Sequence, residues 1–173
     1  MALLPITRHA VIVGDYRYQL TRGWPTAVSG TYPRTVCWIM LNPSTADADK
    51  DDNTLRKIMK YTRRWGYDAL TVVNLFAYRA TDPRDLIAAS KGGVDVVGDD
   101  RWIEESVDRA HLVVCGWGTS VDKIAGGATR ARAVLSRLGT KATALRITQD
   151  GHPQHPLYLP GHLVPVRVTE PTT

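Results

Sequence analysis

Apolar and polar residues alternate in blocks along the chain, and four of the apolar blocks have the length of buried strands. These blocks cover residues 35–41, 69–75, 111–117 and 141–147. Each is too short to form a helix of its own and is rich in residues that favour strands. Residues 9–21 show a weaker alternation, which Gly14 and Asp15 can turn into a hairpin. An edge strand is expected at residues 164–168.

Helical patterns separate these blocks. They cover residues 53–65, a short stretch that opens at Pro83, residues 99–110 and residues 126–138. Alternation of strands and helices predicts a parallel sheet with right-handed crossovers. We therefore predict an α/β fold with three layers, α/β/α, in which a central, mostly parallel four-stranded sheet is accompanied by an N-terminal β-hairpin.

The composition indicates one domain that spans residues 1–173. Hydrophobic residues make up 43% of the 173 positions, and the net charge of +5 suits a polyanionic partner such as nucleic acid. Cys37 and Cys115 lie in apolar blocks, which predicts buried free thiols. No apolar run approaches the ~20 residues of a membrane span, and Pro5 interrupts the N-terminus too early for a secretion signal. We expect a cytoplasmic monomer without a cofactor.

Polar residues mark the ends of the strand-like blocks. Pro43 keeps the residue before it out of the helical region, so Asn42 is held extended at the mouth of a strand. Asn74 lies near the end of the second block, Gly118 follows the third, and His155 belongs to the loop after the fourth. Ligands bind at the carboxyl ends of the strands in such sheets. We therefore expect these four positions to converge on one cleft.

Each of these positions also has an ordinary structural interpretation. Asn42 can belong to a simple turn, and a buried asparagine such as Asn74 can be satisfied by neighbouring groups. A lone histidine in a polar loop is usually solvated. Gly116 and Gly118 are not followed by the Gly-Lys-Ser/Thr of a phosphate-binding loop, so we expect them to permit a close approach of backbone.

Four closely spaced aspartates precede the first helix: Asp47, Asp49, Asp51 and Asp52. Their alternation resembles a calcium loop, but Asp52 stands where that loop needs glycine and Ile58 where it needs glutamate. We expect Asp51 or Asp52 to cap the helix instead. His152 and His155 have no third ligand of useful spacing nearby, so no metal site is expected.

The first helical pattern carries an apolar face and a basic remainder. The basic positions that we expect to contact a DNA backbone are Arg56, Lys60, Arg63 and Arg64. The alternative is that these side chains form an ordinary solvated face.

Two short motifs resemble those of the uracil-DNA glycosylase superfamily. Residues 40–43, Met-Leu-Asn-Pro, match the last two places of a Gly-x-(Asp/Asn)-Pro motif, and residues 155–159, His-Pro-Leu-Tyr-Leu, are similar to a His-Pro-Ser-Pro-Leu motif. The segments LNPSTAD, VVNLFAYRATDP and HPLYL also resemble a bacterial domain-of-unknown-function family that we place in this superfamily. The likeness covers about residues 34–160.

The resemblance implies a DNA glycosylase-like hydrolase that cleaves the N-glycosidic bond of uracil or of a modified base. Asn42 would position the water, and His155 would donate a hydrogen bond to the base oxygen. The residues implied in substrate binding are Pro43, Ser44, Asn74, Phe76, Tyr158 and Leu159. Asn74 would pair with the base edge, and Leu159 would be the apolar wedge that helps to flip the base.

The sequence also departs from these motifs. Met40 replaces the glycine and is expected to reshape or close the space near the nucleotide, and Leu157 replaces the serine. The aromatic residue that stacks on the base has three candidates: Tyr61, Phe76 and Tyr158. Two other functions stay open, namely an enzyme that acts on free nucleosides, nucleotides or hypermodified phage bases, and a non-catalytic reader of modified DNA.

Overall fold

The computed structural model describes residues 7–25, 32–44 and 46–168. Its strands are β1 (Thr7–Val13), β2 (Tyr16–Gly23), β3 (Thr35–Met40), β4 (Ala69–Asn74), β5 (Leu112–Cys115), β6 (Ala142–Ala144) and β7 (Val166–Arg167). Its α-helices are α1 (Asn53–Arg64), α2 (Pro83–Lys91), α3 (Arg101–Asp108) and α4 (Gly127–Leu138), and its 3₁₀ helices are η1 (Thr119–Lys123), η2 (Gly139–Lys141) and η3 (Pro156–Tyr158). Among the described helices, none is long and apolar enough to cross a membrane.

All seven strands join one mixed sheet in the order β1-β2-β4-β3-β5-β6-β7. The three pairings between β4 and β6 are parallel, and the three outer pairings, β1-β2, β2-β4 and β6-β7, are antiparallel. The α/β class is confirmed, but the prediction of a four-stranded sheet is wrong. The hairpin is not an appendage, because β2 pairs with β4 over residues 20–23 and extends the sheet.

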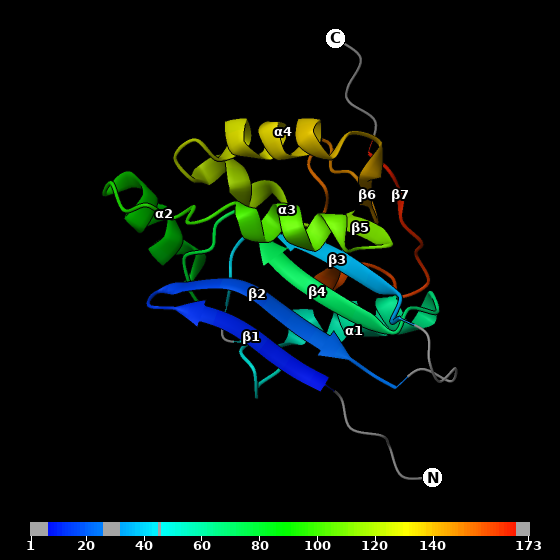
Figure 1. The fold of residues 1–173 in the computed structure, drawn as a ribbon. Coiled ribbons are helices and arrows are strands. Elements are labelled where there is room, and N and C mark those ends of the chain that lie inside the picture. The colour runs from blue at the N-terminus through cyan, green and yellow to red at the C-terminus, as the bar shows by residue number, and fades with distance from the viewer. Residues whose placement is uncertain (1–6, 26–31, 45, 169–173) are drawn as a thin grey trace.

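The sheet separates two hydrophobic cores because successive side chains of a strand point to opposite faces. Cys37 and Ile39 face the core beneath α3 and α4, whereas Val36, Trp38 and Met40 face the core beneath α1. Figure 1 shows α3 and α4 together on one face of the sheet and α1 on the other. The described chain therefore has the three layers expected from its alternating pattern.

Both cysteines are buried and free, as expected. Burial away from water raises the pKa of the Cys37 thiol to about 12 and the pKa of the Cys115 thiol as well. Thiols of this kind are packing groups rather than nucleophiles.

The first turn of α1 is built as the aspartates predict. The side chain of Asp52 accepts a hydrogen bond from the Leu55 backbone N–H at 2.7 Å and caps the helix. Asp51 accepts from Arg8 and from Arg22, a fully buried arginine of β2. The acidic segment therefore ties the hairpin to the start of α1.

Candidate active site

A cavity of about 560 Å³ lies at the carboxyl ends of β3, β4 and β5. In the sheet β3 has β4 on one side and β5 on the other, so the chain passes from β3 to β4 in one direction and from β4 back across β3 to β5 in the other. Such a switch in strand order leaves a crevice in which open α/β sheets bind their ligands. The four positions expected to converge, Asn42, Asn74, Gly118 and His155, all line the cavity.

Asn42 is held in one orientation by two backbone carbonyls. Its Nδ2 donates to the carbonyl oxygens of Pro43 at 3.0 Å and Ala80 at 2.9 Å. Since both partners only accept, the amide nitrogen must occupy this position and both of its hydrogens are used. The carbonyl oxygen Oδ1 therefore remains as the group that Asn42 can offer to a ligand or a water molecule.

Asn74 presents a buried amide at the end of β4. The residue is only 5% exposed, and neither Oδ1 nor Nδ2 has a hydrogen-bond partner among the described residues. Leaving a buried polar group unpaired costs roughly 1–3 kcal/mol per group. An adjacent donor and acceptor in a cavity wall match a ligand that carries an acceptor beside a donor, as amide-like ring edges do.

His155 is brought to the cavity by the close approach of its loop to β5. Gly118 has φ +74°, and a Cβ built there would lie 3.4 Å from the His155 Cβ. A Cβ at Gly116 would lie 3.1 Å from Pro156 Cδ. The N–H of Gly118 also donates to the Pro153 carbonyl at 2.9 Å. The two glycines thus have the packing role expected of them.

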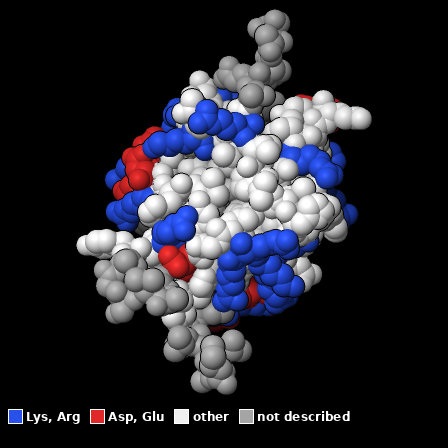
Figure 2. Space-filling view, turned by 90° about the vertical axis from the view of Figure 1, so that its right-hand side faces the viewer, with Lys and Arg blue, Asp and Glu red and all other residues white. Residues whose placement is uncertain are grey.

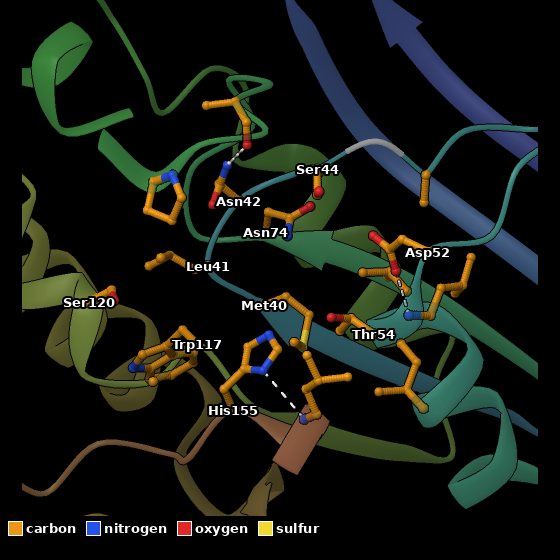
Figure 3. A pocket seen from close by; sticks show the side chains of 18 of the residues that line it. Met40, Leu41, Asn42, Ser44, Asp52, Thr54, Asn74, Trp117, Ser120 and His155 are labelled. Atoms are coloured by element: carbon orange, nitrogen blue, oxygen red, sulfur yellow. Dashed lines mark hydrogen bonds between the residues drawn. The ribbon is translucent and has the colours of Figure 1, made fainter. Parts of the chain in front are cut away.

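The imidazole of His155 is neutral at pH 7 and has a defined tautomer. Its Nδ1 accepts a hydrogen bond from the Leu157 N–H at 3.4 Å, which leaves the proton on Nε2. Burial lowers its pKa below the ordinary value of 6.5, although nearby Asp52 acts in the opposite direction. Figure 3 shows the ring between Trp117 and Met40. His155 is therefore a neutral hydrogen-bond donor to the cavity.

Two charged residues of the cavity were not recognised in the sequence. Arg17, at the start of β2, is only 4% exposed, and burial lowers its pKa to about 10. Its Nη1 donates to the Ala46 carbonyl, while Nε has no hydrogen-bond partner among the described residues. Asp52, expected only as a cap, also lines the cavity. The charge of each residue was visible, but nothing local indicated that the hairpin would reach this site.

Met40, at the place of the motif glycine, lines the cavity and does not close it. Met40 is 5% exposed and lines the cavity floor, where its sulfur would lie 3.3 Å from a Cβ on Gly116. The cavity nevertheless keeps the volume given above. Leu157, at the place of the motif serine, lines it as well.

The predicted substrate-binding residues separate into two groups. Ser44 and Tyr158 line the cavity, and Tyr158 is 88% exposed at its rim. Pro43 is buried and contributes its carbonyl to the Asn42 amide. Phe76 is buried in the core beneath α3 and α4. Of the three stacking candidates, only Tyr158 lines the cavity, because Phe76 and Tyr61, a residue of α1, are both buried in the cores.

Leu159 does not have the position of a wedge. It is only 2% exposed and packs in the core beneath α1. The hydroxyl of Tyr61 donates to the carbonyl oxygens of Leu159 and Pro160, which fixes this turn against the helix. An intercalating side chain must project into solvent, so the structure places Leu159 as an anchor of the His155 loop.

The basic side chains of α1 are exposed but spread along its length. Thr54, Leu55 and Ile58 near the helix start line the cavity, whereas Arg63 and Arg64 lie at the other end, just before β4 begins. Figure 2 views the side of the molecule at which the parallel strands begin, and lysines and arginines gather there in several groups. Of the four predicted DNA contacts, Arg56 lies nearest the cavity in the helix, and its guanidinium bonds to Asp51 and Asn53.

Within the described part of the chain, no three His, Cys, Asp or Glu side chains come together as a possible metal site. His152, considered beside His155 as a ligand, instead pairs with Asp122 at 2.8 Å.

The fold is that of an α/β protein with a cavity at the switch point of its sheet. Over residues 17–157 the sequence matches the family described as Protein of unknown function (DUF1643), and the chain belongs to that family. No curated protein and no solved structure matches it. The expected membership of a family of unknown function is thus confirmed, and none of these comparisons connects the chain to the uracil-DNA glycosylases.

Proposed function

We propose that the protein binds a nucleobase in this cavity and hydrolyses its N-glycosidic bond, as the likeness to uracil-DNA glycosylases implies. The observation that carries the proposal is the buried amide of Asn74, which has no hydrogen-bond partner among the described residues. It shares one cavity with the neutral imidazole of His155 and with Asn42, whose Oδ1 accepts no hydrogen bond from the described residues. A donor-acceptor edge, a water-holding oxygen and a hydrogen-bond donor are what this reaction requires.

In the proposed reaction Asn42 acts through Oδ1. This oxygen accepts a hydrogen bond from the attacking water and orients it toward C1′ of the sugar. The C1′–N bond breaks, and its electron pair leaves with the base. The water oxygen bonds to C1′, and the proton that it releases passes through solvent to the base anion, so the products are the free base and a sugar with a hydroxyl group at C1′. Since an amide is a poor base, Asn42 positions the water rather than deprotonating it.

His155 and Asn74 act on the departing base. The Nε2–H of His155 donates to a base oxygen as negative charge develops there, and a neutral imidazole can do so without first losing a proton. Asn74 holds the base by its edge. Tyr158 at the rim supplies an aromatic face for stacking.

The base has two candidate carriers, DNA and a free nucleoside. DNA is the candidate that the motifs and the net charge of +5 favour. The free nucleoside is favoured by the burial of Leu159 and by the distance of Arg63 and Arg64 from the cavity end of α1. A reader of modified DNA would use the same base contacts without cleavage.

A base-release assay tests the proposal on both candidates. The protein is incubated with single- and double-stranded oligonucleotides that carry uracil, hypoxanthine, xanthine or 5-hydroxymethyluracil, and separately with the matching nucleosides. Alkali then cuts abasic sites in the oligonucleotides, and chromatography detects free bases. We expect release of at least one base, and its loss in Asn42→Ala.

The matched control is Asn53→Ala, which removes an exposed asparagine at the start of α1 that does not line the cavity. Activity that survives Asn42→Ala unchanged would exclude Asn42 from the mechanism. Binding of modified DNA without release of any base would contradict the hydrolase and support a non-catalytic reader of modified DNA.

A further inference from the structure

The cavity has room for more than a nucleobase. Its volume of about 560 Å³ falls within the ~300–1,000 Å³ typical of sites that enclose a whole small molecule. Figure 3 shows Asp52 and Thr54 on one side of the cavity and Trp117 and Ser120 on the opposite side, with Asn74 between them. A base held at Asn74 therefore leaves the end of the cavity beside Asp52 and Thr54 open. This polar end is available to the group to which the base is attached.

Asp52 gives this polar end an acceptor in a fixed place. Its Oδ1 is engaged by the Leu55 N–H at 2.7 Å, so the carboxyl group cannot rotate freely. Oδ2 accepts no hydrogen bond from the described residues. Ser44 and Thr54 line the same cavity and carry hydroxyl groups that both donate and accept.

Arg17 gives the polar end a buried donor. Arg17 lines the cavity and is 4% exposed, and its Nε has no hydrogen-bond partner among the described residues. With its pKa lowered to about 10 by burial, the guanidinium still carries its charge at neutral pH. Arg17 and Asp52 both line this cavity, and the Asp52 carboxylate favours the charged form of the guanidinium. The ligand group that fits must therefore satisfy a donor and an acceptor together.

We infer that this end of the cavity binds the ribose of a ribonucleoside, with Asp52 accepting hydrogen bonds from the sugar hydroxyls and Arg17 donating to their oxygens. The inference rests on the proposed function for the base and names its substrate class, a free ribonucleoside rather than DNA. Hydroxyl groups both donate and accept, as the pair requires. A phosphate fits less well, because the Asp52 carboxyl already occupies the start of α1, where an anion would otherwise bind.

The arrangement discriminates between ribose and 2′-deoxyribose. A site whose buried polar groups bind a hydroxyl leaves those groups unpaired when the hydroxyl is missing. The buried position of Leu159 and the remote position of Arg63 and Arg64 agree with a substrate that is not a DNA duplex.

Titration calorimetry on the full chain tests the inference. The probes are uridine, cytidine, inosine and guanosine, each compared with its 2′-deoxy counterpart. We expect the preferred ribonucleoside to bind at least about tenfold more tightly than its 2′-deoxy form, because a charge-assisted hydrogen bond is lost.

Asp52→Asn is the decisive variant, since asparagine also caps helices and we expect it to keep the start of α1 intact. Its Oδ1 still accepts from Leu55, so an NH₂ group replaces the free carboxyl oxygen. We expect this variant to lose most of the tenfold preference. The matched control is Asp82→Asn, because Asp82 caps α2 in the same way and does not line the cavity.

The outcomes separate this inference from the proposed function. Equal affinity of the wild type for both sugars, or binding of none of the nucleosides, overturns the ribose site. Release of a base from DNA without nucleoside binding also overturns it but leaves the glycosidase standing. A preference for ribose that depends on Asp52, without release of any base, supports the ribose site and contradicts the proposed hydrolase activity. If Asp52→Asn does not fold, the wild-type ratio alone decides.

Discussion

The amide of Asn42 is bound to the carbonyl of Ala80 at 2.9 Å, across 38 positions of sequence. The same Nδ2 donates to the Pro43 carbonyl. The loop after β3 is thereby joined to the segment after β4, and the free Oδ1 is oriented by the backbone alone. This relationship explains why an amide, rather than a carboxylate, occupies the mouth of β3.

Replacement of Asn42 by aspartate should therefore destabilise the protein at neutral pH. A carboxylate would point an oxygen at two carbonyl oxygens, and we expect a loss of about 1–3 kcal/mol. The folded state would raise the pKa of the new carboxyl group, so stability should be restored as the pH falls toward 4. Thermal unfolding from pH 4 to pH 8 measures this. A variant as stable as the wild type at pH 8 would contradict the orientation assigned to Asn42.

The convergence of Asn42, Asn74, Gly118 and His155 could be predicted from the sequence for a physical reason. Parallel strands run in one direction, so residues at their carboxyl ends meet at one edge of the sheet whatever the strand order. Asn42, Asn74 and Gly118 lie at the ends of apolar blocks that were visible as short runs, and His155 lies in the loop that follows the fourth block. The position of the cavity at the carboxyl ends of the parallel strands thus follows from local sequence patterns.

The remainder of the site depends on pairings that local patterns do not encode. β2 runs antiparallel to β4, and this brings the start of β2, with Arg17, beside the end of β4. Likewise, the spacing of four residues between His155 and Leu159 does not reveal that Leu159 turns inward beneath α1. Edge pairing and loop direction are set by tertiary contacts, which periodicity alone does not contain.

Replacement of Asn74 by leucine should stabilise the fold and abolish ligand binding. The amide has no partner to lose among the described residues, so removing its burial cost should raise the free energy of unfolding by about 1 kcal/mol. The control is Thr62→Val. Thr62 is buried and bonds to Trp38 and Ile58, so its removal should destabilise. Denaturant unfolding compares the two variants, and a destabilised Asn74→Leu would mean that the amide has a structural role.

The pH dependence of ligand binding should follow His155. Because burial lowers its pKa below 6.5, we expect constant affinity above pH 6.5 and weaker affinity as the pH falls through the lowered value. The unfolded chain then binds a proton that the folded chain does not, so stability also decreases as the pH falls below 6.5 and levels off below the folded-state pKa. His162→Gln, at an exposed histidine, is the control. NMR titration of the His155 ring gives the pKa directly, and a value above 6.5 would refute this prediction.

The glycine at position 118 should be required for the His155 loop. Alanine there combines a φ of +74° with a Cβ 3.4 Å from His155, whereas Gly151 has φ +81° and nothing within 4 Å. Both Gly→Ala variants pay the strain of about 1–2 kcal/mol. We expect only Gly118→Ala to weaken binding in addition, because relaxation of its strained backbone would move a residue that lies directly against His155. Calorimetry measures the ligand affinity of both variants, which are expected to lose similar stability. Weaker binding by Gly118→Ala alone would show that its contact with His155 matters, and equal affinities would contradict the prediction.

Tyr158 and Leu159 are neighbours in sequence, and their substitutions should have opposite effects. Leu159→Ala removes a side chain that is 2% exposed and leaves a void in the core. We therefore expect a loss of about 2–4 kcal/mol in the free energy of unfolding. Tyr158→Ala removes a side chain that is 88% exposed at the cavity rim and should leave stability within about 0.5 kcal/mol. Affinity should fall for Tyr158→Ala through lost stacking. If Leu159→Ala instead kept full stability and lost only the binding of DNA, Leu159 would be a wedge, and the turn at η3 would have to open to expose it.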